Sequence, residues 1–322
     1  MNKNKEPLLI VNNLKKYFST KDGDLHAVDD ISFFLESGKT LGVVGESGCG
    51  KSTLGRTILR LIDPTSGKVF LDGEDIVAMN SSQLRKARLK MQMIFQDPYS
   101  SLDPRLSVAD LISDPLRVNR IYSNKKEIDE RIDMLMEIVG LTPRLRDSYP
   151  HELDGGRRQR IGIARSLALD PKFIVCDEPV SALDVSIQAQ ILNILMDLQD
   201  QKGLTYIFIT HDLSVVKHIS DEIMVMYLGQ CVEKANSDDL FRNPLHPYTK
   251  ALMSAIPVAK LSSRNNRHTI IRGEVGNPIN PKPGCRFAPR CDYVCEKCTG
   301  RDIPLLEVSA NHLVSCTLFE KN

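Results

Sequence analysis

The sequence predicts an α/β fold built around a parallel sheet. The segment "KFIVCDE", residues 172–178, is a continuous apolar run that ends in acids, which is typical of a strand buried on both faces. The segment "SIQAQILNILMDLQ", residues 186–199, has apolar residues at helical spacing, and "LTYIFITHD", residues 204–212, is a second buried strand with a polar end. Strand, helix and strand in this order indicate parallel strands whose carboxyl ends carry polar residues.

The elements before this core alternate between strands and one helix. Three short β-like runs lie within residues 8–44, separated by glycine turns. The stretch 51–62 has apolar residues at helical spacing and predicts a helix. Residues 67–76, "GKVFLDGEDI", return to strand character, and residues 81–165 are mostly helical in pattern.

The chain changes character near residue 236. A strand is predicted at "EIMVMYLG", residues 222–229, and the sequence then becomes rich in proline and irregular. We therefore expect a distinct C-terminal extension, held by its cysteines rather than by a large apolar core. The expected domains are 8–260, with a helical subdomain at about 97–165, and 261–322.

Composition narrows the class of protein. The chain has 322 residues, with 42 basic and 41 acidic side chains and a net charge of +1, which gives no argument for nucleic acid as a partner. The N-terminus lacks the apolar core of a signal peptide, and no run of about 18 apolar residues predicts a membrane span. We expect a cytosolic protein that meets a membrane only through a partner.

A phosphate-binding loop follows one of the predicted strands. The stretch "GESGCGKST" matches G-x-x-x-x-G-K-[ST] and stands between a strand and a helix, the context that supports the motif. Its glycines let backbone N–H groups surround phosphates, Lys51 can reach the β and γ phosphates, and the Ser52 hydroxyl can ligate Mg²⁺. The residues of the loop are Gly45, Glu46, Ser47, Gly48, Cys49, Gly50, Lys51, Ser52 and Thr53.

Four polar residues at strand or loop ends complete the expected chemistry. Asp177 ends a buried strand and can hold Mg²⁺, and Glu178 beside it suits polarising an attacking water. Gln96 can touch the metal or that water, and His211 can meet the γ-phosphate. Taken alone, each would be an ordinary helix cap, loop residue or buried histidine. Their functional interpretation therefore depends on the phosphate loop upstream.

The order of these motifs resembles the ATP-binding subunit of an ABC transporter. The resemblance covers residues 8–235 and rests on Gly45–Thr53, Gln96, "LDGGRRQR" at 153–160, "FIVCDEP", "SALD" and His211. It implies a P-loop NTPase cassette, with a RecA-like parallel-sheet core, an antiparallel β subdomain and a helical subdomain, that binds ATP and Mg²⁺. Tyr17 stands where the family places an aromatic residue that stacks on adenine; the alternative is a core-facing aromatic of a strand.

The C-terminal stretch narrows the resemblance. The segments "NPLHPYTKALMSAIP" and "GCRFAPRC" are similar to the extension of dipeptide and oligopeptide importer subunits, a group that includes nickel importers. The family spacing selects Cys285, Cys291, Cys298 and Cys316 as ligands of a [4Fe–4S] cluster, with Zn²⁺ as the alternative. Cys295 is extra, or is a ligand in its turn if the register of the spacing slips. The alternative to a metal site is a set of free or loosely paired thiols in a reducing compartment.

If the resemblance holds, the chain works in a complex. It implies a second, homologous ATP-binding subunit, two transmembrane permease subunits and an extracytoplasmic substrate-binding protein, with this chain at the cytoplasmic face of the plasma membrane. Each ATP would lie between the phosphate loop of one ATPase and the signature motif of the other. The alternatives are a nickel importer ATPase, or a largely ATP-binding regulatory half of a heterodimer.

The signature motif departs from the family pattern L-S-G-G-Q-R-Q-R. Asp154 replaces the serine and Arg157 replaces the glutamine, while Gly155 and Gly156 are kept. An ionised carboxylate only accepts hydrogen bonds, so it repels a phosphate that the serine would bind. Asp154 is also a good helix N-cap, and Arg157 can offset its charge from three residues on. We expect that the site completed by this motif binds ATP but turns it over slowly.

Overall fold

The computed structural model describes residues 7–255, 273 and 276–320, which form two compact units. The first unit comprises residues 36–39 and 78–209, and the second comprises 7–35, 40–77 and the described residues from 210 on. The boundary expected between residues 260 and 261 lies outside the described residues.

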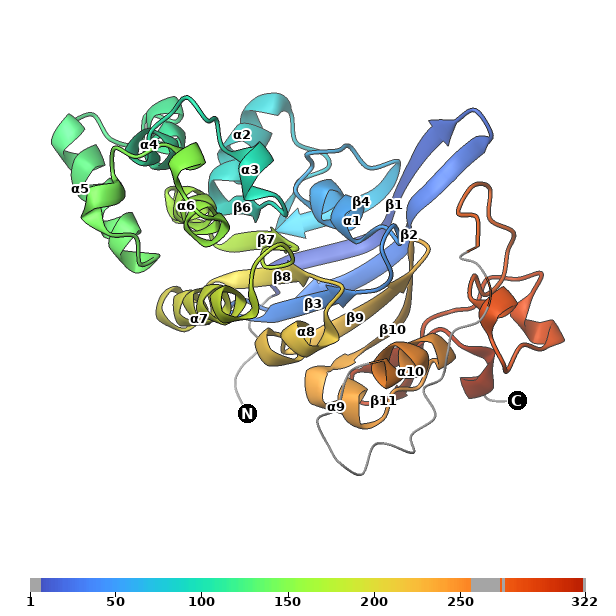
Figure 1. Cartoon of the computed structure of the whole chain (residues 1–322). Helices are drawn as coiled ribbons and strands as arrows, with labels where there is room; N and C mark the ends of the chain where they lie inside the picture. The colour runs from blue at the N-terminus through green and yellow to red at the C-terminus, as the bar shows by residue number, and fades with distance from the viewer. Residues whose placement is uncertain (1–6, 256–272, 274–275, 321–322) are drawn as a thin grey trace, which may run out of the picture. The chain divides into compact units, whose positions relative to one another are not determined.

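The first unit holds a short parallel sheet and a group of helices (Figure 1). Strands β6, β7 and β8 pair in parallel, in that order, which confirms the predicted α/β core. Strands β7 and β8 are buried along their whole length, as their continuous apolar sequences predict. Its elements are α2 (Ser81–Lys90), β6 (Met91–Ile94), α3 (Pro98–Ser101), α4 (Val108–Val118), α5 (Lys125–Ile138), α6 (Gly155–Leu167), β7 (Phe173–Asp177), α7 (Val185–Lys202) and β8 (Thr205–Ile209), with 3₁₀ turns at Pro143–Leu145 and Pro150–Glu152.

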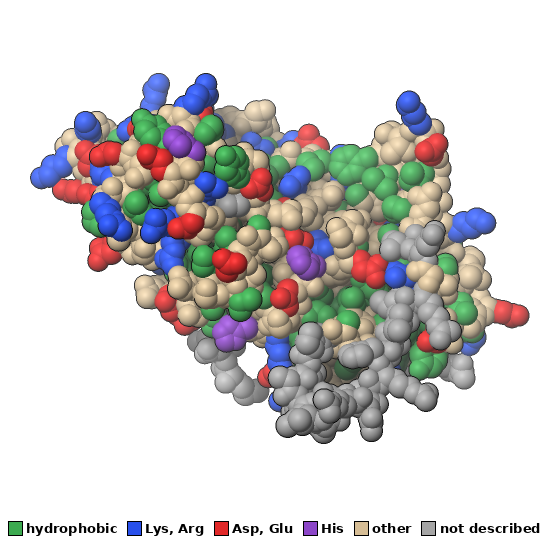
Figure 2. All heavy atoms as spheres, in the orientation of Figure 1, with side chains coloured by type: hydrophobic (Ala, Val, Ile, Leu, Met, Phe, Trp, Pro, Cys, Tyr) green, Lys and Arg blue, Asp and Glu red, His purple; other side chains and the backbone are tan. Residues whose placement is uncertain are grey.

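The helical part of this unit carries an evenly mixed surface. Figure 2 shows Lys and Arg side chains interspersed with Asp and Glu over α4 and α5. Helix α5 has the sequence KKEIDERIDMLMEI and buries Ile132, Leu135 and Met136 on one face, the pattern of an amphipathic surface helix. The mixture matches the near-zero net charge of the whole chain.

The second unit contains an antiparallel sheet with strand order β2-β1-β4-β5. In its other sheet, β3 pairs with β9 in parallel, and β9, β10, β12 and β11 continue antiparallel. Its elements are β1 (Leu9–Thr20), β2 (Gly23–Leu35), β3 (Thr40–Val44), α1 (Lys51–Ile58), β4 (Ser66–Leu71), β5 (Glu74–Asp75), α8 (Leu213–Ile219), β9 (Glu222–Tyr227), β10 (Gln230–Asn236), α9 (Ser237–Arg242), α10 (Pro247–Ser254), β11 (Leu306–Ser309) and β12 (His312–Val314), with 3₁₀ turns at Ala288–Arg290, Glu296–Cys298 and Thr317–Phe319.

Three elements differ in detail from the sequence-based expectations. The run 67–76 is a hairpin of two strands, because Asp72 and Gly73 adopt positive φ angles and turn the chain. Strand β6 lies inside the stretch expected to be helical. Helix α1 ends at Ile58 instead of residue 62, because Arg60 has a φ of 49° that no α-helix accommodates.

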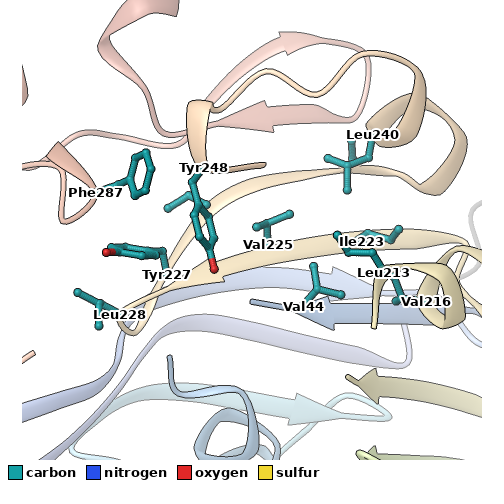
Figure 3. Packing of buried hydrophobic residues seen from close by; sticks show 12 residues of the cluster. Val44, Leu213, Val216, Ile223, Val225, Tyr227, Leu228, Leu240, Tyr248 and Phe287 are labelled. Atoms are coloured by element: carbon teal, nitrogen blue, oxygen red, sulfur yellow. The ribbon is translucent and has the colours of Figure 1, made fainter. Parts of the chain in front are cut away.

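The expectation for the C-terminal extension was also wrong. Residues after 236 form α9, α10 and β11, which Figure 1 labels, and also β12, which pairs with β10. The buried side chains of Tyr248 and Phe287 join an apolar cluster with Tyr227, Val225 and Val44 (Figure 3). An apolar core therefore holds this region, and the cysteines are not its sole anchor.

Candidate functional site

The phosphate loop joins β3 to α1 within the second unit. Gly45 has a φ of 154°, and a Cβ there would lie 2.2 Å from the carbonyl oxygen of Met226. Gly50, the N-cap of α1, has a φ of 103°, and a Cβ there would lie 1.9 Å from the carbonyl oxygen of Ala27. Only glycine fits either position, so these two residues fix the path of the loop. At Gly48 an added Cβ would meet no atom within 4 Å, so that part of the loop borders open space.

Lys51 lies folded under this loop. Its side chain is almost fully buried, and Nζ donates to the carbonyl oxygens of Gly45 at 2.8 Å and Glu46 at 3.0 Å. These bonds compensate the burial of its charge. Burial raises the pKa of the neighbouring Cys49 thiol, which therefore stays protonated at neutral pH and behaves as a small apolar side chain.

Tyr17 of β1 belongs to a polar cluster in the same unit. Its ring stacks on His26, with the ring centroids 3.7 Å apart and the planes 14° from parallel. Its hydroxyl donates to a carboxylate oxygen of Asp29, and burial together with this bond raises the pKa of Tyr17. Half-buried in this way, the residue predicted to stack on adenine has one ring face covered by His26.

His211 follows β8 and is exposed in the second unit. The residue before it, Thr210, donates its N–H to the carbonyl oxygen of Val43 at 3.2 Å. The residue after it, Asp212, caps α8 by accepting from Ser214 and Val215. The backbone therefore places His211 at the end of β3 from which the phosphate loop departs.

The first unit brings together Gln96 and Glu178, which are 82 residues apart in sequence. Nε2 of Gln96 donates to a carboxylate oxygen of Glu178 at 3.0 Å. Glu178 has a φ of 47°, an uncommon conformation for a residue with a side chain, and Ser181 Oγ donates to its carbonyl oxygen at 3.1 Å. Glu178 is one of ten non-glycine residues with a positive φ in the described part of the chain. Asp177, the last residue of β7, is fully buried.

The signature segment caps α6. Asp154 accepts a hydrogen bond from the backbone N–H of Arg157 at 2.8 Å, and its carboxylate lies 3.4 Å from Nε of Arg157. Both the expected cap and the expected ion pair are therefore present. Gly155 and Gly156 form the first turn of the helix. A Cβ on Gly156 would lie 2.7 Å from Ile187, so only glycine allows α6 to approach α7 this closely.

The C-terminal cysteines lie near one another as free thiols. Burial, with smaller contributions from the neighbouring thiols of Cys298, Cys316 and Cys291, raises the pKa of Cys285 to about 11. Sγ of Cys295 lies 3.7 Å from Sγ of Cys298. Among the described residues, however, no three or more His, Cys, Asp or Glu side chains are arranged to hold a metal ion. The thiols are neighbours without forming a ligand set.

The sequence analysis predicts no role for two arginines near these cysteines. Arg286 pairs with Asp29, and Arg290 pairs with Glu46 of the phosphate loop. Their only signal in the sequence is the presence of two charged residues in "CRFAPRC", and such residues ordinarily lie on the solvated surface.

Comparison with known proteins gives consistent matches along the chain. Residues 28–181 match the ABC transporter family, and residues 232–298 match the C-terminal region of oligopeptide/dipeptide transporters. The chain is 49% identical over 319 residues to the oligopeptide transport ATP-binding protein OppF of Salmonella typhimurium, covering 96% of this chain and 95% of that protein. It is 49% identical to the dipeptide transport ATP-binding protein DppF of Haemophilus influenzae, covering 98% and 97%.

Solved structures agree with these matches. The chain resembles the ATP-binding cassette MJ0796 in a dimeric, post-hydrolysis state bound to ADP and Pi, with a TM-score of 0.66 and 27% identity over 71% of this chain and 98% of that one. It also resembles cbiO1 of Clostridium perfringens, part of an ABC transporter complex, with a TM-score of 0.66 and 28% identity over 74% and 92%. No helix in the described part of the chain is both long and apolar enough to cross a bilayer.

Proposed function

We propose that this chain, which belongs to the ATP-binding subunits of oligopeptide and dipeptide ABC transporters, binds and hydrolyses ATP to drive the import of peptides. The observation that carries the proposal is the phosphate loop, with Lys51 buried beneath it, in a chain that aligns with oligopeptide and dipeptide transport ATP-binding proteins over almost its whole length. The matching C-terminal region favours peptides as the cargo.

The phosphate loop is proposed to hold the triphosphate. Backbone N–H groups from Gly45 to Thr53 and the ammonium of Lys51 supply positive partial and full charges to the β and γ phosphates. Lys51 then exchanges its bonds to loop carbonyls for bonds to phosphate oxygens. The oxygen atoms of Ser52, Gln96 and Asp177 suit Mg²⁺, which when bound neutralises charge on the phosphates. Tyr17 is proposed to pack against the adenine.

Hydrolysis is proposed to depend on Glu178, Gln96 and His211. Glu178 accepts a proton from the attacking water as general base. The amide of Gln96 bonds to the same carboxylate and orients it. His211 is proposed to contact the γ-phosphate and to stabilise the charge that develops there.

The complete transporter is proposed to contain other chains. A second ATP-binding subunit would supply the signature motif facing this chain's phosphate loop, and this chain's Asp154, Gly155 and Gly156 would face the partner's ATP. Two permeases and an extracytoplasmic binding protein would carry the peptide, and the permeases would hold this chain at the cytoplasmic face of the plasma membrane. The ATPase domain is proposed to be 8–260 and the extension 261–322.

The cysteines are proposed to bind a [4Fe–4S] cluster, or alternatively Zn²⁺, through Cys285, Cys291, Cys298 and Cys316. Support comes from four soft donors within one unit, three of which lie near enough to add to the effect of burial on the pKa of the fourth, Cys285. No step of hydrolysis is assigned to such a group. Iron, sulfide and zinc analysis after anaerobic purification decides between the two, with Cys298→Ser expected to abolish loading.

The function is tested by ATP hydrolysis and peptide uptake in the assembled transporter. Glu178→Gln should abolish turnover while ATP binding remains, because the amide cannot accept the proton but keeps the shape of the side chain. A loss of about a hundredfold or more in kcat is expected for removal of a general base. Unchanged hydrolysis in the Glu178→Gln complex would contradict the catalytic assignment, and uptake of nickel without peptides would contradict the cargo.

A further inference from the structure

The segment Cys285–Cys291, "CRFAPRC", carries two buried arginines that the proposed chemistry does not use. The side chains of Arg286 and Arg290 are only 7% and 8% exposed. A buried charge is unfavourable unless it is paired and hydrogen-bonded, so the partners of these two residues are structurally demanding contacts. Both partners lie in the part of the second unit proposed to bind nucleotide.

Arg290 holds the second residue of the phosphate loop. Its Nη1 lies 2.9 Å from one carboxylate oxygen of Glu46 and 3.2 Å from the other. The backbone N–H of Glu46 donates to the hydroxyl of Tyr248 at 2.9 Å, and its carbonyl oxygen accepts from Lys51 at 3.0 Å. Glu46 is thus held at its side chain and at both backbone groups, and two of these contacts come from residues beyond position 240.

Arg286 holds the cluster behind Tyr17. It donates to the carbonyl oxygen of Leu228 and forms an ion pair with Asp29. Asp29 in turn accepts from the hydroxyl of Tyr17 and lies 3.2 Å from Nδ1 of His26. Arg286 therefore contacts Tyr17 only indirectly, through Asp29, which orients the Tyr17 ring.

Phe287, the first of the three residues between the two arginines, fixes their place. Phe287 is 3% exposed and packs against Tyr227 and Tyr248, with both ring centroids 5.3 Å away (Figure 3). Tyr248 is the same residue whose hydroxyl accepts from Glu46. Apolar packing and the ion pairs thus join in one rigid contact between the segment and the loop.

We propose that the segment 285–291 is a two-armed clamp on the nucleotide site, in which Arg290 positions the phosphate loop through Glu46 and Arg286 positions Tyr17 through Asp29. The clamp rests on the proposed function, since it presumes that the loop takes a triphosphate and that Tyr17 takes the base. It makes the C-terminal extension a determinant of nucleotide affinity, with one arginine for the phosphates and the other for the adenine.

The two arms predict different ligand selectivity, which a merely structural role would not produce. The probes are MgATP and the magnesium complex of inorganic triphosphate, measured by calorimetry on the purified full chain. Arg290→Ala should weaken both ligands about tenfold, the usual scale for a residue that orients a contacting group. Arg286→Ala should weaken MgATP by about the same factor and leave inorganic triphosphate unchanged.

Conservative and matched variants complete the test. Arg290→Lys should recover part of the affinity, because it restores the charge without the fork of the guanidinium. Arg301→Ala removes another ion pair of the same region, with Glu320, and should change neither affinity. If Arg290→Ala does not fold, Glu46→Gln tests the same contact from the loop side and should weaken both ligands.

The outcomes separate the clamp from the function on which it rests. Wild-type protein that binds neither ligand defeats the proposed function and the clamp together. Wild-type protein that binds ATP, while Arg286→Ala and Arg290→Ala keep wild-type affinities or lose affinity equally with Arg301→Ala, defeats the clamp alone.

Discussion

Replacing Asp154 by Ser together with Arg157 by Gln should speed ATP turnover at the site that this chain's α6 completes. A carboxylate about 4 Å from a phosphate charge costs about 4 kcal/mol at an effective dielectric of about 20. Nε of Arg157, 3.4 Å from the Asp154 carboxylate, carries the opposite charge and offsets part of this repulsion. Each ~1 kcal/mol of repulsion that remains in the transition state slows turnover about fivefold.

The assay is single-turnover hydrolysis in the assembled complex, with the partner's own general base kept and Glu178 replaced by Gln, so that only the site under study turns over. Measurements of the free energy of unfolding distinguish the effect of the Asp154 charge from its effect as a helix cap. Asp154→Ser keeps an N-cap and should leave the free energy of unfolding nearly unchanged, whereas Asp154→Ala should lower it by about 1 kcal/mol. Asn124→Ala removes the cap of α5, which accepts from Lys126, and serves as the matched control. It should cost the same stability without changing turnover.

Equal turnover in the wild-type complex and in the double variant would refute the reasoning. Asp154 would then be a neutral cap, and the asymmetry between the two ATP sites would have no basis in this motif. A fall in turnover would mean that Arg157 itself binds the phosphate.

Two further predictions concern the second unit. Burial lowers the pKa of His246 to about 4. Between about pH 6.5 and about pH 4 the unfolded chain therefore binds a proton that the folded chain does not. The free energy of unfolding should fall by up to about 3 kcal/mol as the pH falls through this window. His246→Asn keeps an acceptor for the N–H of Tyr248 and should remove this pH dependence of the free energy of unfolding, measured by urea titration between pH 7 and pH 4.5. An unchanged pH dependence in the variant would exclude His246 as its source. Phe287→Ala should cost about 3–5 kcal/mol in chemical denaturation, whereas the control Phe34→Ala, at a half-exposed position, should cost far less; equal small losses would show that polar contacts alone hold the extension.

The parallel core could be predicted because its signals are local. The continuous apolar runs of β7 and β8 and the helical spacing of α7 each need only one segment of sequence to be recognised. The phosphate loop is equally local, since Gly45, Gly50 and Lys51 are required at fixed positions by the turn itself.

The parts that escaped prediction depend on partners distant in sequence. Strand β6 is four residues long and follows α2 directly, so its sequence alone cannot mark it as a strand. It becomes one because β7 offers parallel hydrogen bonds from Met91 to Ile94. Beyond residue 236, Tyr248 and Phe287 show no periodicity, and their packing against buried side chains of β3, β9 and β10 defines them as core residues.

The contact of Gln96 with Glu178 illustrates the same limit within the site. Glu178 follows a predicted strand, whereas Gln96 follows β6, which lies in the stretch expected to be helical. Parallel pairing of β6 with β7 brings the two ends to one edge of the sheet, so the sequence alone could not predict that both side chains gather there. The hydrogen bond between them depends on the positive φ of Glu178, which no propensity predicts for a glutamate.

Glu46 shows how a local motif acquires a non-local constraint. The motif leaves its position open, because phosphates are bound by the backbone and any side chain there satisfies the turn. Here the side chain pairs with Arg290, 244 residues away, and the backbone N–H is bound by Tyr248. In this structure the N–H of Glu46 is bound to a tyrosine hydroxyl and the ammonium of Lys51 to loop carbonyls, so a phosphate would have to replace either bond to reach that group. Gly48, in contrast, borders open space.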